Sequence, residues 1–169
     1  MNEIVEGGLT FSFPQRLRAE KYDDWSFYRN QLTNAFGGAK AVDILCLDSD
    51  CGWLIEIKNY RQHRRSKLVD LDLEVAKKVR DTLAGLVAAS CNANDRDERR
   101  FATEFLAKRA LHVVLHLEQP KNPSRLFPRR VNLVNLTIKL KRSLKAIDAH
   151  PKVVDKDTLK PSMAWTVEG

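Results

Sequence analysis

Short apolar runs rich in β-branched and aromatic side chains predict several strands in this chain. Residues 41–47 (AVDILCL) and 53–60 (WLIEIKNY) are two such runs, and the turn-forming sequence DSDCG between them predicts a hairpin. Residues 110–117 (ALHVVLHL) form a third run, which ends before a proline-containing segment. Residues 4–13 add one strand or a short hairpin around a Gly-Gly pair, and residues 165–167 add another short strand.

Apolar residues at helical spacing predict four helices. The first covers residues 20–36, with one apolar face made of Trp25, Tyr28, Leu32 and Phe36. A longer helix begins at Asp70 or Asp72 and ends near Cys91. Its expected buried stripe consists of Val75, Val79, Leu83, Leu86 and Val87. Shorter helices are expected over residues 98–108 and 131–149, so the order of elements predicts an α/β fold with a mixed central β-sheet and helices on both faces.

Composition and charge narrow the class of protein. The 169 residues are 43% hydrophobic and 30% charged, as expected for one folded domain. The formal net charge of +7 suits a polyanionic partner such as nucleic acid. Three cysteines without C-x-x-C spacing favour reduced thiols. No apolar run reaches transmembrane length and no signal-peptide pattern precedes the domain, so we expect a cytoplasmic protein without membrane contacts.

Three charged residues interrupt the hairpin strands, where a charge needs a partner or a function. Asp43 lies in the first strand, and Glu56 and Lys58 lie in the second. Because side chains alternate along a strand, Glu56 and Lys58 share one face. A turn centred after Asp50 would place Asp43 opposite Lys58 and diagonal to Glu56. A slip of one residue would move Asp43 to the other face.

Two carboxylates and one ammonium group on neighbouring strands have a known chemical use. Carboxylates a few ångströms apart repel each other, which favours a divalent cation between them, and Mg²⁺ prefers oxygen ligands. A lysine beside them can hold the attacking water or stabilise the negative charge of a phosphoryl transition state. These are the parts needed to hydrolyse a phosphodiester. The alternative is a structural salt bridge within an ordinary sheet.

The same residues resemble the motif of the PD-(D/E)xK nuclease superfamily. Asp43 in AVDILCL and the Glu56-Ile57-Lys58 triplet in WLIEIKNYR carry the resemblance. Residues 20–117 resemble the αβββαβ core of the restriction-endonuclease-like fold. The resemblance implies a single nuclease-like domain over residues 1–169, in which a C-terminal helix and tail (residues 131–169) follow the core.

The resemblance also implies a metal-dependent active site. Asp43 and Glu56 would bind Mg²⁺, for which Mn²⁺ can substitute in this family, with the main-chain carbonyl of Ile57 as a further ligand and Lys58 as the catalytic lysine. Val42 stands where the family has a proline before the first acid. Many members add an acid from the first helix, for which the candidates here are Glu20, Asp23 and Asp24, and we prefer Asp24.

Basic residues near the motif predict contacts with backbone phosphates. The connection after the motif strand contains Arg61, Arg64 and Arg65, and Lys77 and Lys78 lie on the expected exposed side of the long helix. A solvated surface is the alternative for both groups.

The leading hypothesis is a Mg²⁺-dependent endonuclease that hydrolyses phosphodiester bonds of DNA, rather than RNA, in repair, restriction or defence. One alternative is a catalytically weak nucleic-acid-binding module or subunit with the same fold. Another is a basic α/β scaffold whose charged triad is structural. The chain is short for an enzyme that also recognises a sequence, so a homodimer or a partner subunit would supply such recognition.

Overall fold

The protein combines a five-stranded mixed sheet with a smaller antiparallel sheet, as seen in a computed structural model that describes residues 1–62, 70–121 and 130–169. The larger sheet has the strand order β3-β4-β5-β6-β7, with β3 (Arg18–Lys21), β4 (Ile44–Leu47), β5 (Cys51–Asn59), β6 (Ala110–Glu118) and β7 (Lys152–Val154). The smaller sheet has the order β1-β2-β8, with β1 (Asn2–Glu6), β2 (Leu9–Phe13) and β8 (Thr166–Glu168). The α-helices of the described residues are α1 (Leu71–Asn92), α2 (Arg96–Leu106) and α3 (Leu133–Leu144). The predicted mixed α/β fold is therefore confirmed.

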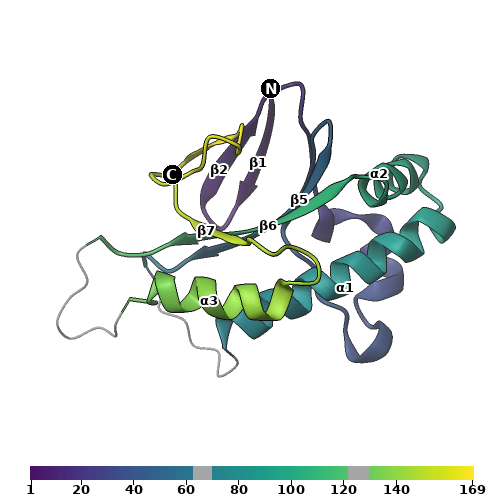
Figure 1. Ribbon diagram of the computed structural model, residues 1–169. Coiled ribbons are helices and arrows are strands. Elements are labelled where there is room, and N and C mark those ends of the chain that lie inside the picture. The colour runs from purple at the N-terminus through teal and green to yellow at the C-terminus, as the bar shows by residue number, and fades with distance from the viewer. Residues whose placement is uncertain (63–69, 122–129) are drawn as a thin grey trace.

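The layers differ from the prediction in one respect. Helices α1 and α3 cover one face of the five-stranded sheet, and the small sheet with β1 and β2 lies over the other face (Figure 1). Helices on both faces were expected, but the N-terminal hairpin and the C-terminal strand take the place of a helix layer. The two glycines of that hairpin, Gly7 and Gly8, have φ of 58° and 75°, the left-handed conformation that a tight two-residue turn requires.

The connectivity of the large sheet sets the position of the charged residues. β3, β4 and β5 form an antiparallel meander, and β6 then runs parallel to β5. A parallel neighbour needs a crossover connection, which α1 and α2 supply between β5 and β6. The resemblance implies the order αβββαβ, from which the described residues differ by lacking the first helix and by having two helices between β5 and β6. The crossover places α1 against the sheet face that bears Glu56.

The helix expected over residues 20–36 is wrong. The chain forms β3 and then three short helical turns, η1 (Tyr22–Asp24), η2 (Tyr28–Leu32) and η3 (Ala35–Gly37). The Tyr22 amide donates to the Asp43 carbonyl, so the pairing with the β4 segment continues where a helix would begin. Tyr22 also packs its ring against Trp25 and Tyr28, at centroid distances of 5.1 and 5.3 Å. Tertiary contacts therefore override the helical spacing in this segment.

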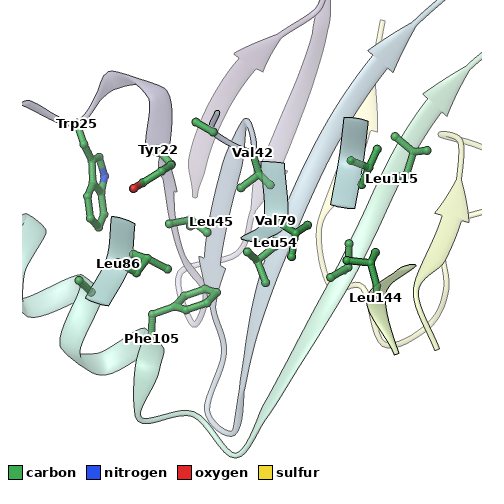
Figure 2. Packing of buried hydrophobic residues seen from close by; sticks show 14 of the residues in the cluster. Tyr22, Trp25, Val42, Leu45, Leu54, Val79, Leu86, Phe105, Leu115 and Leu144 are labelled. Atoms are coloured by element: carbon green, nitrogen blue, oxygen red, sulfur yellow. The ribbon is translucent and has the colours of Figure 1, made fainter. Parts of the chain in front are cut away.

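Two apolar cores lie on the two faces of the large sheet. Figure 2 shows the core on the helix side, to which β4, β5, both crossover helices, β6 and α3 all contribute. The buried stripe of α1 is confirmed at Val75, Val79 and Leu86, whereas Val87 is exposed. Val87 belongs to the opposite side of the helix, because the stripe continues at Ala89 in step with the 3.6-residue period.

Candidate active site

Asp43 and Glu56 lie across from each other at the end of the hairpin. The last paired residues of β4 and β5 are Ile44 and Ile55, so Asp43 is the next residue beyond this pair, opposite Glu56. The predicted register, with Asp43 opposite Lys58, is wrong by two residues. A two-residue shift keeps side chains on the same face, so the expected grouping on one face survives the error.

Hydrogen bonds fix Asp43 and the segment before it. Its Oδ2 accepts from the Ile57 amide at 2.7 Å, which ties the side chain to the motif strand. The amide of the preceding residue, Val42, donates at 3.0 Å to the hydroxyl of Thr82, a fully buried residue of α1. The position of Asp43 is thus determined by both β5 and α1.

Glu56 is the most deeply buried charged residue of the site, with no exposed surface. Its Oε1 lies 2.7 Å from the ammonium nitrogens of both Lys58 and Lys78, and its Oε2 accepts from Lys78 at 2.9 Å. Burial, reinforced by the charge of Asp43, raises the pKa of Glu56 to about 7. The two lysines oppose this rise because they stabilise the ionised carboxylate.

Lys58 is held between two acids. Its Nζ contacts Glu56 at 2.7 Å and Glu74 of α1 at 3.2 Å. Burial alone would lower the pKa of Lys58, but the two carboxylates outweigh it and raise the pKa above its ordinary value. Lys58 is therefore an ammonium group at neutral pH, able to donate hydrogen bonds but not to accept a proton.

Lys78 contacts both Asp43 and Glu56, which was not expected from its sequence position. It was expected on the exposed side of the long helix as a phosphate contact, but its Nζ lies 2.7 Å from Glu56 and 3.3 Å from Asp43, and 16% of its side chain is exposed. The sequence does contain a signal for this position. Lys78 lies between Val75 and Val79, and it follows Glu74 by four residues, so it belongs to the edge of the apolar stripe that faces the sheet.

Five side chains thus form one ionic cluster between the sheet and α1. Three are carboxylates and two are ammonium groups: Asp43, Glu56, Glu74, Lys58 and Lys78. When all of them are ionised, these five described side chains together carry one excess negative charge.

A pocket of about 480 Å³ opens beside the cluster. It is lined by acidic, basic and apolar side chains, among them Asp23, Tyr28, Lys40, Asp43, Leu73, Lys77 and Lys78. The pocket therefore combines an aromatic ring and an exposed leucine with lysine side chains, next to one of the predicted metal ligands.

Among the acids of residues 20–24, the structure places Asp23 beside the site. Asp23 lines the pocket together with Asp43, and its Oδ1 is buried without a hydrogen-bond partner among the described residues. Burial raises the pKa of Asp23. Asp24, which the sequence analysis preferred, is exposed and pairs with Arg29 on the surface. Glu20 accepts a hydrogen bond from Trp25 and contacts Arg18.

The basic residues that were predicted to contact phosphates do not lie together in the structure. Lys77 is exposed and lines the pocket. Arg61 donates to Asn59 and, at 2.7 Å, to the carbonyl of Gly169, so it faces the small sheet rather than Glu56. Arg64 and Arg65 lie outside the described residues.

The donor chemistry of the site fits a hard divalent cation. Asp43 and Glu56 offer oxygen ligands that already share one cationic neighbour, the Lys78 ammonium group, and Asp23 adds a carboxylate oxygen without a partner in the described structure. As they stand, no three acidic, histidine or cysteine side chains of the described residues are close enough to hold one ion. A cation here would therefore be held by two carboxylates and completed by water or substrate oxygens, a ligand set that suits Mg²⁺. The expected contribution of the Ile57 main-chain carbonyl stays a prediction, and the Ile57 amide donates to Asp43.

Comparisons with known proteins give one informative similarity. A cysteine–tRNA ligase from Neisseria meningitidis serogroup A is 34% identical to this chain in an alignment that covers 80% of this chain and 24% of that relative. The chain thus spans about a quarter of the length of the relative it matches. No protein-family model and no solved structure matches the chain. Within the described residues, no helix is long and apolar enough to cross a membrane.

Proposed function

We propose that this protein is a metal-dependent nuclease that hydrolyses phosphodiester bonds of DNA. The observation that carries the proposal is the convergence of Asp43 and Glu56 on a single ammonium group, beside Lys58 and an open pocket. Two facing carboxylates need a positive charge between them, and a nucleic acid together with its divalent cation would supply both substrate and charge.

The chain's own residues have separate roles in this proposal. Asp43 and Glu56 hold the cation, which, when bound, would stabilise the charge that develops on the phosphoryl oxygens. Lys58 donates hydrogen bonds to the attacking water or to a phosphoryl oxygen, because Glu56 and Glu74 keep it charged. The pocket receives the nucleotide next to the scissile bond, with the Tyr28 ring beside the base and Lys40 and Lys77 near the phosphates.

A comparison of two site variants with a matched surface variant tests the proposal. Glu56→Gln removes a ligand and Lys58→Met removes the hydrogen-bond donor, while Glu104→Gln removes one partner of the surface pair with Arg100. Cleavage of duplex and single-stranded DNA is measured with Mg²⁺, Mn²⁺ or EDTA. We expect each site variant to lose at least about 100-fold in rate, and Glu104→Gln to cleave like the parent protein.

Thermal unfolding of the same variants separates catalysis from structure. If the ionic cluster only supports the fold, removing one member leaves a buried charge unpaired and costs about 3–5 kcal/mol. A parent protein that cleaves no substrate with any cation, or site variants that retain full activity, would contradict the nuclease proposal.

The similarity to a tRNA ligase favours a second candidate, a module that binds or cuts RNA. That relative is named as a cysteine–tRNA ligase, and about a quarter of its length aligns with 80% of this chain. The same assays therefore include tRNA and an unstructured RNA. Metal-independent binding of tRNA without cleavage would support the binding module over the nuclease.

The setting of the proposed activity follows from the same features. We propose a cytoplasmic protein, since Cys46, Cys51 and Cys91 are all free thiols, as a reducing compartment requires. A second copy of the chain or a partner subunit would position the substrate. Sedimentation with and without DNA measures this.

A further inference from the structure

Lys78 occupies the place in the cluster that a metal ion would need. Its ammonium nitrogen contacts Glu56 at 2.7 Å and Asp43 at 3.3 Å, whereas Lys58 contacts Glu56 and Glu74. Lys78 is thus the lysine that bridges the two proposed ligands. Lys78 belongs to α1, which lies over the sheet, so its two ion pairs also link α1 to the hairpin.

We propose that the Lys78 ammonium group replaces the divalent cation in the free protein, and that cation binding displaces it into the adjacent pocket, where it pairs with a phosphate of the substrate. This inference rests on the proposed function in one respect, namely that Asp43 and Glu56 bind a divalent cation.

Electrostatics make the displacement necessary. A cation held by Asp43 and Glu56 would lie within contact distance of the Lys78 ammonium group, and two positive charges at such a separation repel strongly in a site shielded from water. If Lys78 were absent, the two carboxylates would face each other without the charge that now joins them. The lysine therefore stabilises the acid pair in the free protein and competes with the metal for it.

The structure also provides a destination for the displaced group. Lys78 lines the same pocket as Asp43, together with Tyr28, Lys40 and Lys77. Its four-carbon side chain is flexible enough for the ammonium group to leave the acid pair while the helix stays in place. In the pocket it would join Lys40 and Lys77, so three ammonium groups would become available to phosphates of a nucleic acid.

This arrangement couples the two binding events. Cation binding releases Lys78 for the substrate, and a phosphate that holds Lys78 in the pocket relieves the competition for the acid pair. The coupling is reciprocal, because each ligand must raise the affinity of the other by the same factor. Substrate affinity should therefore rise with the concentration of divalent cation in the parent protein.

Calorimetric titration with Mg²⁺ and Mn²⁺, in the absence of nucleic acid, provides the first test. Lys78→Met removes the competing charge and should tighten cation binding about tenfold or more, while Lys78→Arg keeps the charge and should bind cations no more tightly than the parent protein. Lys141→Met is the matched control, because it removes the same charge from an exposed helical position, in α3, that does not line the pocket. Its cation affinity should stay within about twofold of the parent value, since it lacks the contact with the acid pair.

Amine labelling of the unaltered protein supplies a second test that requires no variant. The reaction of each lysine with a methylating reagent is measured by mass spectrometry, with and without Mg²⁺. Mg²⁺ should increase the labelling of Lys78 several-fold as its side chain moves into the pocket. Lys58 should show no comparable increase, because Glu74 continues to hold it.

The outcomes separate this inference from the proposed function. If Glu56→Gln abolishes cation binding but Lys78→Met binds cations like the parent protein, or if labelling of Lys78 stays constant, the displacement is refuted while the metal site stands. If the parent protein and Lys78→Met both fail to bind Mg²⁺ and Mn²⁺, the metal site itself is refuted and the displacement with it.

Discussion

Replacing Gly85 by alanine tests how the segment before β4 is held against α1. A Cβ at position 85 would overlap the hydroxyl oxygen of Tyr22 and lie 2.8 Å from Cδ1 of Leu32. Tyr22 is fully buried and its ring is confined by Trp25 and Tyr28, so it has little room to move. The overlap should therefore disturb the turn that also carries the hydrogen bond from the Tyr22 amide to Asp43.

The expected magnitude combines two opposing effects. Alanine favours a helix over glycine by about 1 kcal/mol, whereas overpacking a well-filled core costs about 1–3 kcal/mol. Since the new atom would overlap a buried and confined hydroxyl, we expect the upper end of that range and a net loss of about 2 kcal/mol in the free energy of unfolding. For a chain of 169 residues this corresponds to a decrease in Tm of about 4–8 °C.

The Tyr22→Phe variant identifies the atom responsible. The Tyr22 hydroxyl has no hydrogen-bond partner among the described residues, so its removal should leave stability unchanged or raise it by about 1 kcal/mol. Without the hydroxyl, the nearest atom of the ring is Cζ, at 3.5 Å from the added Cβ, which is an ordinary contact. The close contact that remains is with Cδ1 of Leu32, the end of a flexible side chain that can shift. When Tyr22→Phe is already present, Gly85→Ala should then cost nothing, or gain up to about 1 kcal/mol.

Urea denaturation of the parent protein, both single variants and the double variant measures this coupling. We expect an interaction energy of about 2–3 kcal/mol between the two positions. Additive effects, with a coupling below about 0.5 kcal/mol, would show that the Tyr22 hydroxyl does not exclude a side chain at position 85.

Two further predictions concern stability at low pH and nucleic-acid affinity. Burial lowers the pKa of His116 below its ordinary value of 6.5, so the unfolded chain takes up a proton at a pH where the folded protein does not. The contribution of His116 to the free energy of unfolding should therefore decrease as the pH falls below about 6.5, while the raised pKa of Glu56 acts in the opposite direction. Denaturation at several pH values should show that acidification destabilises His116→Gln less than the parent protein, whereas the exposed control His150→Gln should behave like the parent protein. Replacing both Lys40 and Lys77 with alanine should weaken nucleic-acid binding and reduce the slope of log affinity against log salt by about two, as measured by fluorescence anisotropy; an unchanged slope would place the phosphates elsewhere.

The sequence was sufficient to predict the helices and strands whose apolar pattern reflects burial alone. The two hairpin strands, β6 and the buried stripe of α1 follow from apolar periodicity alone, because each has one or both faces in a core. The antiparallel meander was predicted without its first strand, β3. This strand has the sequence RAEK, in which Ala19 is the buried residue. Four residues with one buried side chain carry no periodic signal, and only the pairing with β4 makes them a strand.

The sequence predicted that charged residues of the two hairpin strands lie on one face, but neither their register nor the contact with Lys78. Strand parity places Glu56 and Lys58 on one face, and this depends only on β5 being a strand. The register with Asp43 depended on the turn, which a sequence such as DSDCG does not specify to within one residue. The contact of Lys78 with the acid pair was missed, because it requires α1 to cross this face of the sheet, a tertiary fact that local spacing does not contain.

The alternation of side chains in β5 has a consequence for how such a site can be altered. Glu56 and Lys58 face the helices, while Ile55 and Ile57 belong to the core beneath the small sheet. One strand therefore carries part of the ionic cluster on one side and an apolar surface on the other. Substitutions that change the charges on the helix side leave that apolar surface intact, so the charged residues can vary while the second core continues to specify the same fold.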